Sequence, residues 1–180
     1  ARNFNIPSLN DLYFTPGGNP DLKPEQGFSA DAGISNIYTR KNLAIKTEAG
    51  INYSKIYDWI LWRPTAMGYW TPDNIDAVIA SGAELNINLL FQSNNFKFNS
   101  IANYAFTKSV RADVVETIND ESTGKQLPYI PKHSANLYSR ISWKNYYFSY
   151  QWTYFSTRYT TSAAEPGILV SIYPYFMNDI

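Results

Sequence analysis

The 180-residue chain has no cysteine and a single histidine, and its 15 basic and 15 acidic residues leave no net charge. Without cysteine, the chain holds neither a disulfide framework nor a thiolate metal site. His133 has no second histidine with which to form a metal or acid–base centre, so a hydrogen-bonding role at the start of a strand is the better interpretation. The balanced charge predicts no broad attraction to nucleic acid or to anionic lipid.

Long apolar runs and catalytic patterns are missing as well. Segments such as Trp59-Ile60-Leu61-Trp62 extend for only four residues, whereas a transmembrane helix needs about 20. No catalytic triad or pair of carboxylates is recognisable, and no phosphate-binding pattern follows Gly17-Gly18. We therefore expect no enzyme, no bound cofactor, no resident metal and no helical segment.

The dominant positive feature is an alternation of apolar and polar residues. From Leu43 to Ser54 the odd positions are mostly apolar and the even positions mostly polar, which is the period of a strand with two different faces. The same alternation recurs in residues 26–38, 83–91, 95–107, 135–143 and 146–154, and a further strand starts at Tyr173. The pattern predicts an all-β chain.

The connections between these segments alternate between short and long. Short turns are expected at 38–42, 93–95 and 144–145, and long polar connections at 63–76, 111–128 and 160–171. Strands of about 10–17 residues are long enough to cross a membrane, which takes about 9–11, whereas sandwich strands cluster near 5–6. We predict one unit, residues 1–180: an antiparallel meander of about seven strands that forms part of a transmembrane β-barrel. The alternative is a soluble β-sandwich, such as a carbohydrate-binding module.

The alternation also assigns residues to the two faces of the barrel wall. Aromatic residues make up 17% of the chain and gather near both ends of the strands, as in the two interfacial belts of a membrane barrel. The apolar set expected to face lipid is Ile45, Ile51, Leu85, Phe98 and Leu137. The polar set expected to line the lumen is Lys46, Glu48, Glu84, Asn99 and Arg140.

A motif precedes the first long strand. The run from Ile6 to Tyr13 (Ile-Pro-Ser-Leu-Asn-Asp-Leu-Tyr) is followed, after Gly17-Gly18, by Asn19-Pro20-Asp21-Leu22-Lys23-Pro24-Glu25. Two prolines fix φ and remove two donors, so this second run should form an extended corner outside the sheet. Together the two runs resemble a segment of TonB-dependent outer-membrane receptors. The motif residues are Asn19, Pro20, Leu22, Lys23, Pro24 and Glu25.

The resemblance extends through Leu127–Ala135 and Tyr173–Ile180, and so covers essentially the whole chain. It implies the C-terminal part of a family barrel of about 22 strands in the Gram-negative outer membrane. The long connections would then be extracellular and the short turns periplasmic. The N-terminal plug and the terminal strands of such a barrel would lie outside these 180 residues.

Family members usually import a scarce metal chelate. The residues from Ser8 to Phe14, with the turn that follows, look most like the vitamin B12 and siderophore branches, so the implied ligand is cobalamin or a ferric siderophore. The implied partners are outer-membrane lipid and the TonB complex, reached through the plug, with a surface lipoprotein as a further candidate. No nucleic-acid partner is implied.

Two groups of residues in the long connections invite a functional interpretation. Trp62, Arg63, Tyr69 and Trp70 could stack on a flat ligand, or they could belong to an aromatic belt and to loop packing; both interpretations stay open. Asp113, Glu116, Asp120 and Glu121 carry the oxygen ligands that Ca²⁺ prefers. Their spacing matches no defined calcium loop, so a solvated acidic loop is the better interpretation.

Overall fold

A computed structural model of the chain describes residues 1–112, 125–160 and 171–180. The elements are β1 (Arg2–Asn5), α1 (Leu9–Tyr13), β2 (Glu25–Arg40), β3 (Leu43–Pro64), β4 (Trp70–Ser93), β5 (Phe96–Arg111), β6 (His133–Trp143), β7 (Tyr146–Phe155), β8 (Arg158–Tyr159), β9 (Ser171–Ile172) and β10 (Tyr175–Asp179). Eight of the strands form one sheet in the order β1-β2-β3-β4-β5-β6-β7-β10, and β8 pairs with β9. Every pair of neighbours in the large sheet is antiparallel.

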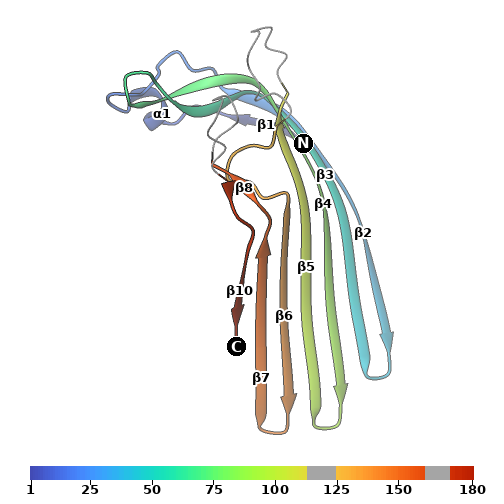
Figure 1. Ribbon diagram of the computed structural model, residues 1–180. Coiled ribbons are helices and arrows are strands. Elements are labelled where there is room, and N and C mark those ends of the chain that lie inside the picture. Colours follow the sequence, from blue (N-terminus) through green and yellow to red (C-terminus); the bar gives the residue numbers. More distant parts are fainter. Residues whose placement is uncertain (113–124, 161–170) are drawn as a thin grey trace.

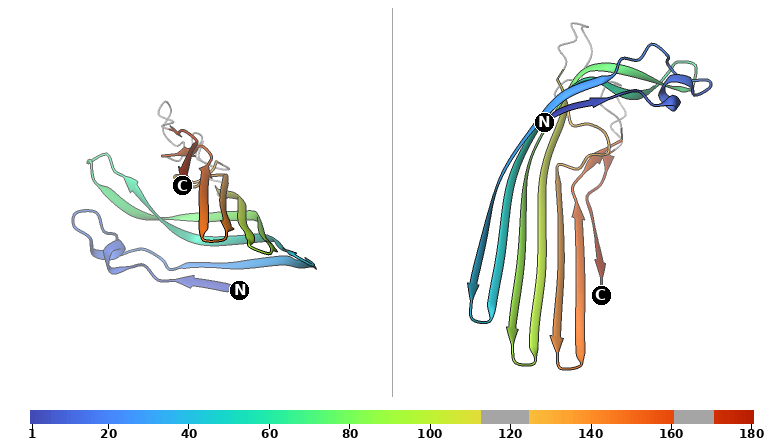
Figure 2. Two further views of the ribbon diagram at one scale, coloured as in Figure 1. Left: turned by 90° about the horizontal axis from the view of Figure 1, so that it is seen from below. Right: turned by 180° about the vertical axis from the view of Figure 1, so that it is seen from behind.

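The large sheet is a single curved layer, in which most strands pair with the next one along the chain (Figure 1). Three tight turns lie at one end of the layer, and α1 and the turn between β3 and β4 lie at the other. Figure 2 shows that β1 and β10, the two edges of the described sheet, do not meet. The predicted antiparallel meander is confirmed.

The three tight turns each contain two residues. β2 and β3 are joined at Lys41-Asn42, β4 and β5 at Asn94-Asn95, and β6 and β7 at Lys144-Asn145. The first residue of each turn has a positive φ: 45° at Lys41, 47° at Asn94 and 52° at Lys144. Two-residue hairpins favour positive φ because the backbone then follows the right-handed twist of the strands. The predicted short turns are therefore confirmed.

The ladder assigns every side chain of the sheet to one of two faces. Directly paired residues of antiparallel strands point to the same side, and Ile51 pairs with Ala83, which pairs with Phe106. Carried across the sheet, the register puts one set on a single face: Ile45, Ile51, Leu85, Phe98 and Leu137. The opposite face carries Lys46, Glu48, Glu84, Asn99 and Arg140.

Long polar side chains on the second face are accommodated by ion pairing and by two glycines. Lys46 Nζ lies 2.8 Å from Glu48 Oε1, two positions along β3. A β-carbon at Gly50 would lie 3.1 Å from Glu84 Oε1, and one at Gly82 would lie 3.0 Å from Asn52 Oδ1. Because glycine has no side chain, the Glu84 side chain can lie over Gly50 and the Asn52 side chain over Gly82.

Four short elements were not predicted: α1, β1, β8 and β9. The expectation of no helical segment is wrong, because α1 forms after a capping box in which Ser8 and Asp11 each bond the other's backbone N–H. Its five residues are too few to produce a helical period in the sequence. β1 pairs with β2 over four residues and likewise lacks a readable alternation. Within the described ranges, no helix has the length and apolar content needed to cross a membrane.

The predicted long connection 63–76 is also wrong. β3 continues to Pro64 and β4 begins at Trp70, so the turn comprises residues 65–69 only. The ends of β3 and β4 contain proline and a mixture of polar and apolar residues. They pair only with each other, beyond the main sheet, so no buried face requires apolar and polar residues to alternate there. The other two long connections contain residues 113–124 and 161–170, outside the described residues, and the acidic residues from Asp113 to Glu121 lie there.

Opposite effects are expected for arginine on the two faces. Ile51 is 64% exposed on the apolar face, and its neighbour Asn52 lies on the polar face. A cation at the lipid midplane of a barrel costs about 2–4 kcal/mol, so Ile51→Arg should reduce the amount of folded full-length barrel in the membrane. Asn52→Arg is the matched control and should assemble normally. Equal assembly of the two variants would contradict the face assignment.

The two ends of the sheet should be accessible from opposite sides of the membrane. Met67, at the tip of the β3–β4 hairpin, is 82% exposed, and Asn145 lies in a turn at the other end. In intact cells, an impermeant thiol reagent should label Met67→Cys and leave Asn145→Cys unlabelled until the outer membrane is opened. Labelling of Asn145→Cys alone would reverse the orientation.

Candidate functional site: the outer ribbon of strands β3 and β4

The far ends of β3 and β4 leave the main sheet as a two-stranded outer ribbon, residues 59–75. β2 stops pairing with β3 at Tyr57, and β5 stops pairing with β4 at Val78. Beyond these points β3 and β4 pair only with each other, up to Pro64 and Trp70. In Figure 1 the ribbon bends away from the direction of the sheet and lies beside α1.

A break in the ladder separates the outer ribbon from the sheet. The β3–β4 register passes from the Tyr57–Ala77 pair directly to the Trp59–Ile75 pair. Asp58, between the two pairs, has a φ of 53°. Aspartate is one of the few residues that adopt this left-handed conformation readily. β3 therefore changes direction at Asp58.

The motif segment, residues 19–25, runs beside the outer ribbon. Asn19 Nδ2 donates to the carbonyl of Pro72 at 3.1 Å, and its Oδ1 accepts from the N–H of Asp21 at 3.0 Å. Leu22 is buried, and no residue from Asn19 to Pro24 belongs to a strand. The predicted corner outside the sheet is confirmed up to Pro24, and Glu25 is the first residue of β2.

Asn74 and Glu25 connect the ribbon to this segment through backbone groups. Asn74 Oδ1 accepts from the N–H of Lys23 at 2.8 Å, and its Nδ2 donates to the carbonyls of Lys23 at 3.0 Å and Asp58 at 2.6 Å. Glu25 Oε1 accepts from the N–H of Ile60 at 2.8 Å. Its Oε2 accepts from Asn5 Nδ2 at 2.9 Å. Lys23 and Glu25 thus contribute through main-chain and carboxylate atoms, respectively.

Helix α1 contacts the ribbon at Trp62. The indole Nε1 donates to Asp11 Oδ1 at 2.9 Å, and the ring meets Phe14 edge-on with centroids 5.9 Å apart. A β-carbon at Gly17 would collide with the carbonyl of Trp70, so only glycine permits this approach. Trp62 is consequently part of the packing between α1 and the ribbon.

The other side of the ribbon base packs on a small apolar core. Ile75, Val78 and Leu127 are buried there, with Trp59, Leu61 and Ile130 packed around them. Gln126 secures the segment that carries Leu127: its Oε1 accepts from the N–H of Ser109 at 3.1 Å, and its Nε2 donates to the carbonyl of Thr107 at 3.1 Å. The ribbon base is therefore held from both sides.

The four residues singled out from the sequence do not form one surface. Trp62 pairs with Pro72 and Trp70 with Pro64, which puts both tryptophans on one face, whereas Arg63 pairs with Thr71 on the other. Tyr69 Oη lies 3.7 Å from Met67 Sδ at the tip, and Trp70 is 57% exposed. Loop packing accounts for Trp62, whereas Trp70 is exposed beside the tip turn.

His133 has the role expected at the start of a strand. It is the first residue of β6, and its N–H donates to Ser156 Oγ at 3.0 Å. Its Nδ1 lies 2.8 Å from Tyr104 Oη, and its ring is tilted against that of Phe106 with centroids 5.3 Å apart. In the described part of the chain, no three His, Cys, Asp or Glu side chains are grouped so that they could hold a metal ion.

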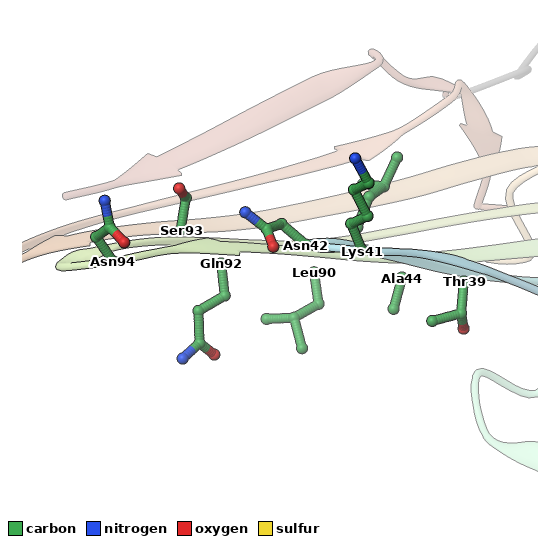
Figure 3. A pocket seen from close by; sticks show the side chains of 9 residues that line it. Thr39, Lys41, Asn42, Ala44, Leu90, Gln92, Ser93 and Asn94 are labelled. Atoms are coloured by element: carbon green, nitrogen blue, oxygen red, sulfur yellow. The ribbon is translucent and has the colours of Figure 1, made fainter.

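A hollow of about 440 Å³ lies at the tight turns that join β2 to β3 and β4 to β5. Figure 3 shows that Thr39, Ala44, Leu90 and Gln92 point to one side of the sheet, and that Lys41, Asn42, Ser93 and Asn94 lie on the other. Side chains that point to opposite faces cannot converge on one ligand. The outer ribbon is therefore the better candidate for a functional site.

A single layer of long antiparallel strands with one apolar and one polar face is the wall of a transmembrane β-barrel. The chain belongs to the family described as TonB dependent receptor-like, beta-barrel, whose family model matches residues 1–179. It is part of an outer-membrane protein of Gram-negative bacteria. The family match sets aside the soluble carbohydrate-binding module.

Two curated relatives share part of the sequence. The vitamin B12 transporter BtuB of Vibrio vulnificus is 37% identical over 83 residues, which cover 46% of this chain and 13% of that protein. The vitamin B12 transporter BtuB of Photobacterium profundum is 34% identical over 86 residues, which cover 46% and 14%. The match therefore spans only a small part of each relative's length, and both relatives are named as transporters.

A solved structure supports the fold over nearly the whole chain. The copper transporter OprC matches with a TM-score of 0.65 and 17% sequence identity, covering 98% of this chain and 26% of that chain. At this identity the likeness is one of fold alone. The described strands thus have the arrangement found in one sector of a complete barrel.

Sequence reasoning missed the residues that position the ribbon. Ser8 and Asp11 have the spacing of a capping box, a signal that could have revealed α1. Asp58 and Asn74 carry no comparable signal. The role of Asn74 depends on the close approach of Lys23, 51 positions away in the sequence.

Acid should loosen the contact between α1 and the ribbon. The Ser8 hydroxyl, with a smaller contribution from the Trp62 indole, lowers the pKa of Asp11 from its ordinary value of 3.8. A lowered pKa in the folded state stabilises the contact above the unfolded value, and this stabilisation is lost as the pH falls through the folded value. Amide-exchange protection of residues 8–14 in the full-length protein should therefore be constant from pH 7 to 5 and decrease below about 4.

Asp11→Asn should lower that protection at neutral pH and remove its acid dependence, because the carboxylate is no longer present. Asp21→Asn is the control, since Asp21 is exposed and bonds Asn19 through its backbone N–H, which the substitution preserves. An acid transition that survives in Asp11→Asn would assign the effect to another group.

Proposed function

We propose that the chain is a segment of an active-transport receptor that binds a scarce metal chelate outside the cell and imports it with energy coupled through TonB. The chain supplies part of the barrel wall and one outer ribbon. The observation that carries the proposal is the match of nearly half the chain to two proteins named as vitamin B12 transporters. Cobalamin is accordingly the first ligand to test, and a ferric siderophore is the alternative.

In this proposal the apolar face of the sheet contacts outer-membrane lipid, and the polar face lines the lumen. Charged groups at hydrocarbon depth are costly, so the face with Lys46, Glu48 and Glu84 belongs on the side away from lipid. Asn99 and Arg140 lie on the same face, and the Arg140 guanidinium lies 4.5 Å from the centroid of the Tyr147 ring. The lumen of the complete barrel would hold the plug that contacts TonB.

The ligand-contacting part of this segment would be the tip of the outer ribbon. Trp70 is 57% exposed there and Tyr69 precedes it in the tip turn, whereas Arg63 lies on the opposite face of the ribbon and would not contact the same ligand. Aromatic rings suit a planar ligand. Trp62 would support this surface from behind through Asp11 and Phe14. A surface lipoprotein, if the complete receptor has one, would meet the same end of the barrel.

Removal of the tip rings should weaken ligand capture without affecting assembly. Loss of a stacking ring is worth about 0.5–1.5 kcal/mol, so Tyr69→Ala with Trp70→Ala should raise the apparent Kd of the full-length receptor for labelled cobalamin by roughly 5- to 100-fold. Surface abundance of the barrel should be unchanged. Ala66→Ser is the control, because Ala66 is an exposed residue of the same turn and the substitution neither adds nor removes a ring.

A parallel measurement with a ferric siderophore distinguishes the two ligand classes. Cobalamin binding that is weakened in the double variant and retained in Ala66→Ser supports the proposal. Binding of the siderophore alone would transfer the proposal to that class. Binding of neither ligand by the wild-type receptor would overturn it.

A further inference from the structure

The outer ribbon extends beyond the main sheet, and no third strand pairs with it. Within the main sheet, β3 and β4 each have a second neighbour, but residues 59–75 have none. A two-stranded hairpin by itself is only marginally stable in water. The direction in which the ribbon leaves the sheet must therefore be set by contacts other than the ladder.

The ladder break at Asp58 gives the ribbon freedom to turn. Asp58 has no partner in the register, and its positive φ redirects β3 at this point. Residues that absorb a change of φ and ψ between two paired segments are where hinges form. The apolar core at Ile75 and Val78 anchors the base of β4 next to this break, whereas the tip extends beyond it.

Just beyond the break, one residue pair of the ribbon, Ile60 with Asn74, makes hydrogen bonds to the motif segment. Ile60 and Asn74 are directly paired across β3 and β4. Glu25 accepts the N–H of Ile60, and Asn74 bonds both the N–H and the carbonyl of Lys23. Both strands of the ribbon are therefore hydrogen-bonded to the end of the motif segment, β3 through Ile60 and β4 through Asn74.

Asn74 also spans the break itself. Its Nδ2 donates to the carbonyl of Asp58 as well as to that of Lys23. An amide satisfies these three backbone groups because it combines one acceptor oxygen with two donor hydrogens. Aspartate would keep only the acceptor, and leucine would keep neither function.

We propose that Asn74 and Glu25 are positioning residues that latch the outer ribbon to residues 23–25 and fix the direction of its tip, with Asp58 as the hinge. The latch concerns the position of the ribbon and holds whether or not the tip binds a ligand. It gives the motif residues Lys23 and Glu25 a physical role, because they present two main-chain groups and one carboxylate to the ribbon. The consequence for the proposed function is that an unlatched ribbon would carry Tyr69 and Trp70 away from a fixed position.

The latch can be tested by a distance measurement that needs no ligand. Because the chain contains no cysteine, spin labels can be attached at Met67→Cys on the tip and Asn145→Cys in a tight turn of the full-length receptor, after replacement of any cysteine elsewhere. Double electron–electron resonance then reports the distribution of distances from the tip to the far end of the barrel. The matched controls are Asp73→Ala and Asp21→Ala, exposed neighbours of Asn74 and Leu22.

A single narrow distance distribution is expected for the wild type and both controls. Asn74→Ala and Glu25→Ala should broaden it or add a second population. Each hydrogen bond lost should lower the ratio of latched to unlatched ribbon roughly 2- to 12-fold. Glu25→Gln should restore the narrow distribution, since the amide oxygen still accepts from Ile60 and the Asn5 amide can reverse to meet the new donor.

Distributions identical to the wild type in both alanine variants would overturn the latch. Failure of both variants to assemble, with both controls assembled, would also overturn it, because the contacts would then serve folding instead of ribbon position. Where the distances confirm the latch, cobalamin binding by Asn74→Ala tests the consequence separately. Unlatching with normal binding would contradict the role of the ribbon in ligand capture and would leave the latch intact.

Discussion

The backbone hydrogen bond between consecutive strands is the constraint on which this fold depends. A barrel wall in lipid has no water to satisfy unpaired N–H and C=O groups, so each strand must pair along its length. The chain meets this requirement with a meander in which neighbours in sequence are neighbours in space. Where the ladder ends, side-chain amides and carboxylates form the hydrogen bonds to backbone groups instead. On one side of the ribbon, Gln126 bonds the backbone of Ser109 and Thr107. On the other side, Asn74 bonds the backbone of Lys23, and Glu25 bonds that of Ile60.

The same requirement separates the chain into two regions with different chemistry. Inside the wall, successive side chains point alternately to the lipid and to the lumen. Each position is therefore restricted to one residue class, apolar towards lipid and polar towards the lumen. Outside the wall, helix α1, the motif segment and the outer ribbon pack irregularly, and glycine or proline is tolerated. Gly17 illustrates this freedom, since it allows the main chain to approach Trp70 more closely than any other residue would.

This separation explains what could be predicted from the sequence. The strands from Leu43 to Ser54 and from Phe96 to Thr107 were readable because burial against lipid enforces their alternation. The tight turns were readable because lysine and asparagine follow strand ends there. The outer ribbon was taken for a loop, since a two-stranded ribbon has no lipid face to impose a period. The side chain of Asn74 forms hydrogen bonds to a residue remote in the sequence, so no local sequence pattern predicts its role.

Four of the hydrogen bonds that hold the outer ribbon end on main-chain groups: the carbonyl of Pro72, the N–H of Ile60, and both polar groups of Lys23. Main-chain groups are the same whatever side chain is attached. The five residues of the tip turn, 65–69, are therefore free to diverge without loosening their own mounting. With such a mount, the sequence of the tip turn can change while the base of the ribbon keeps its position.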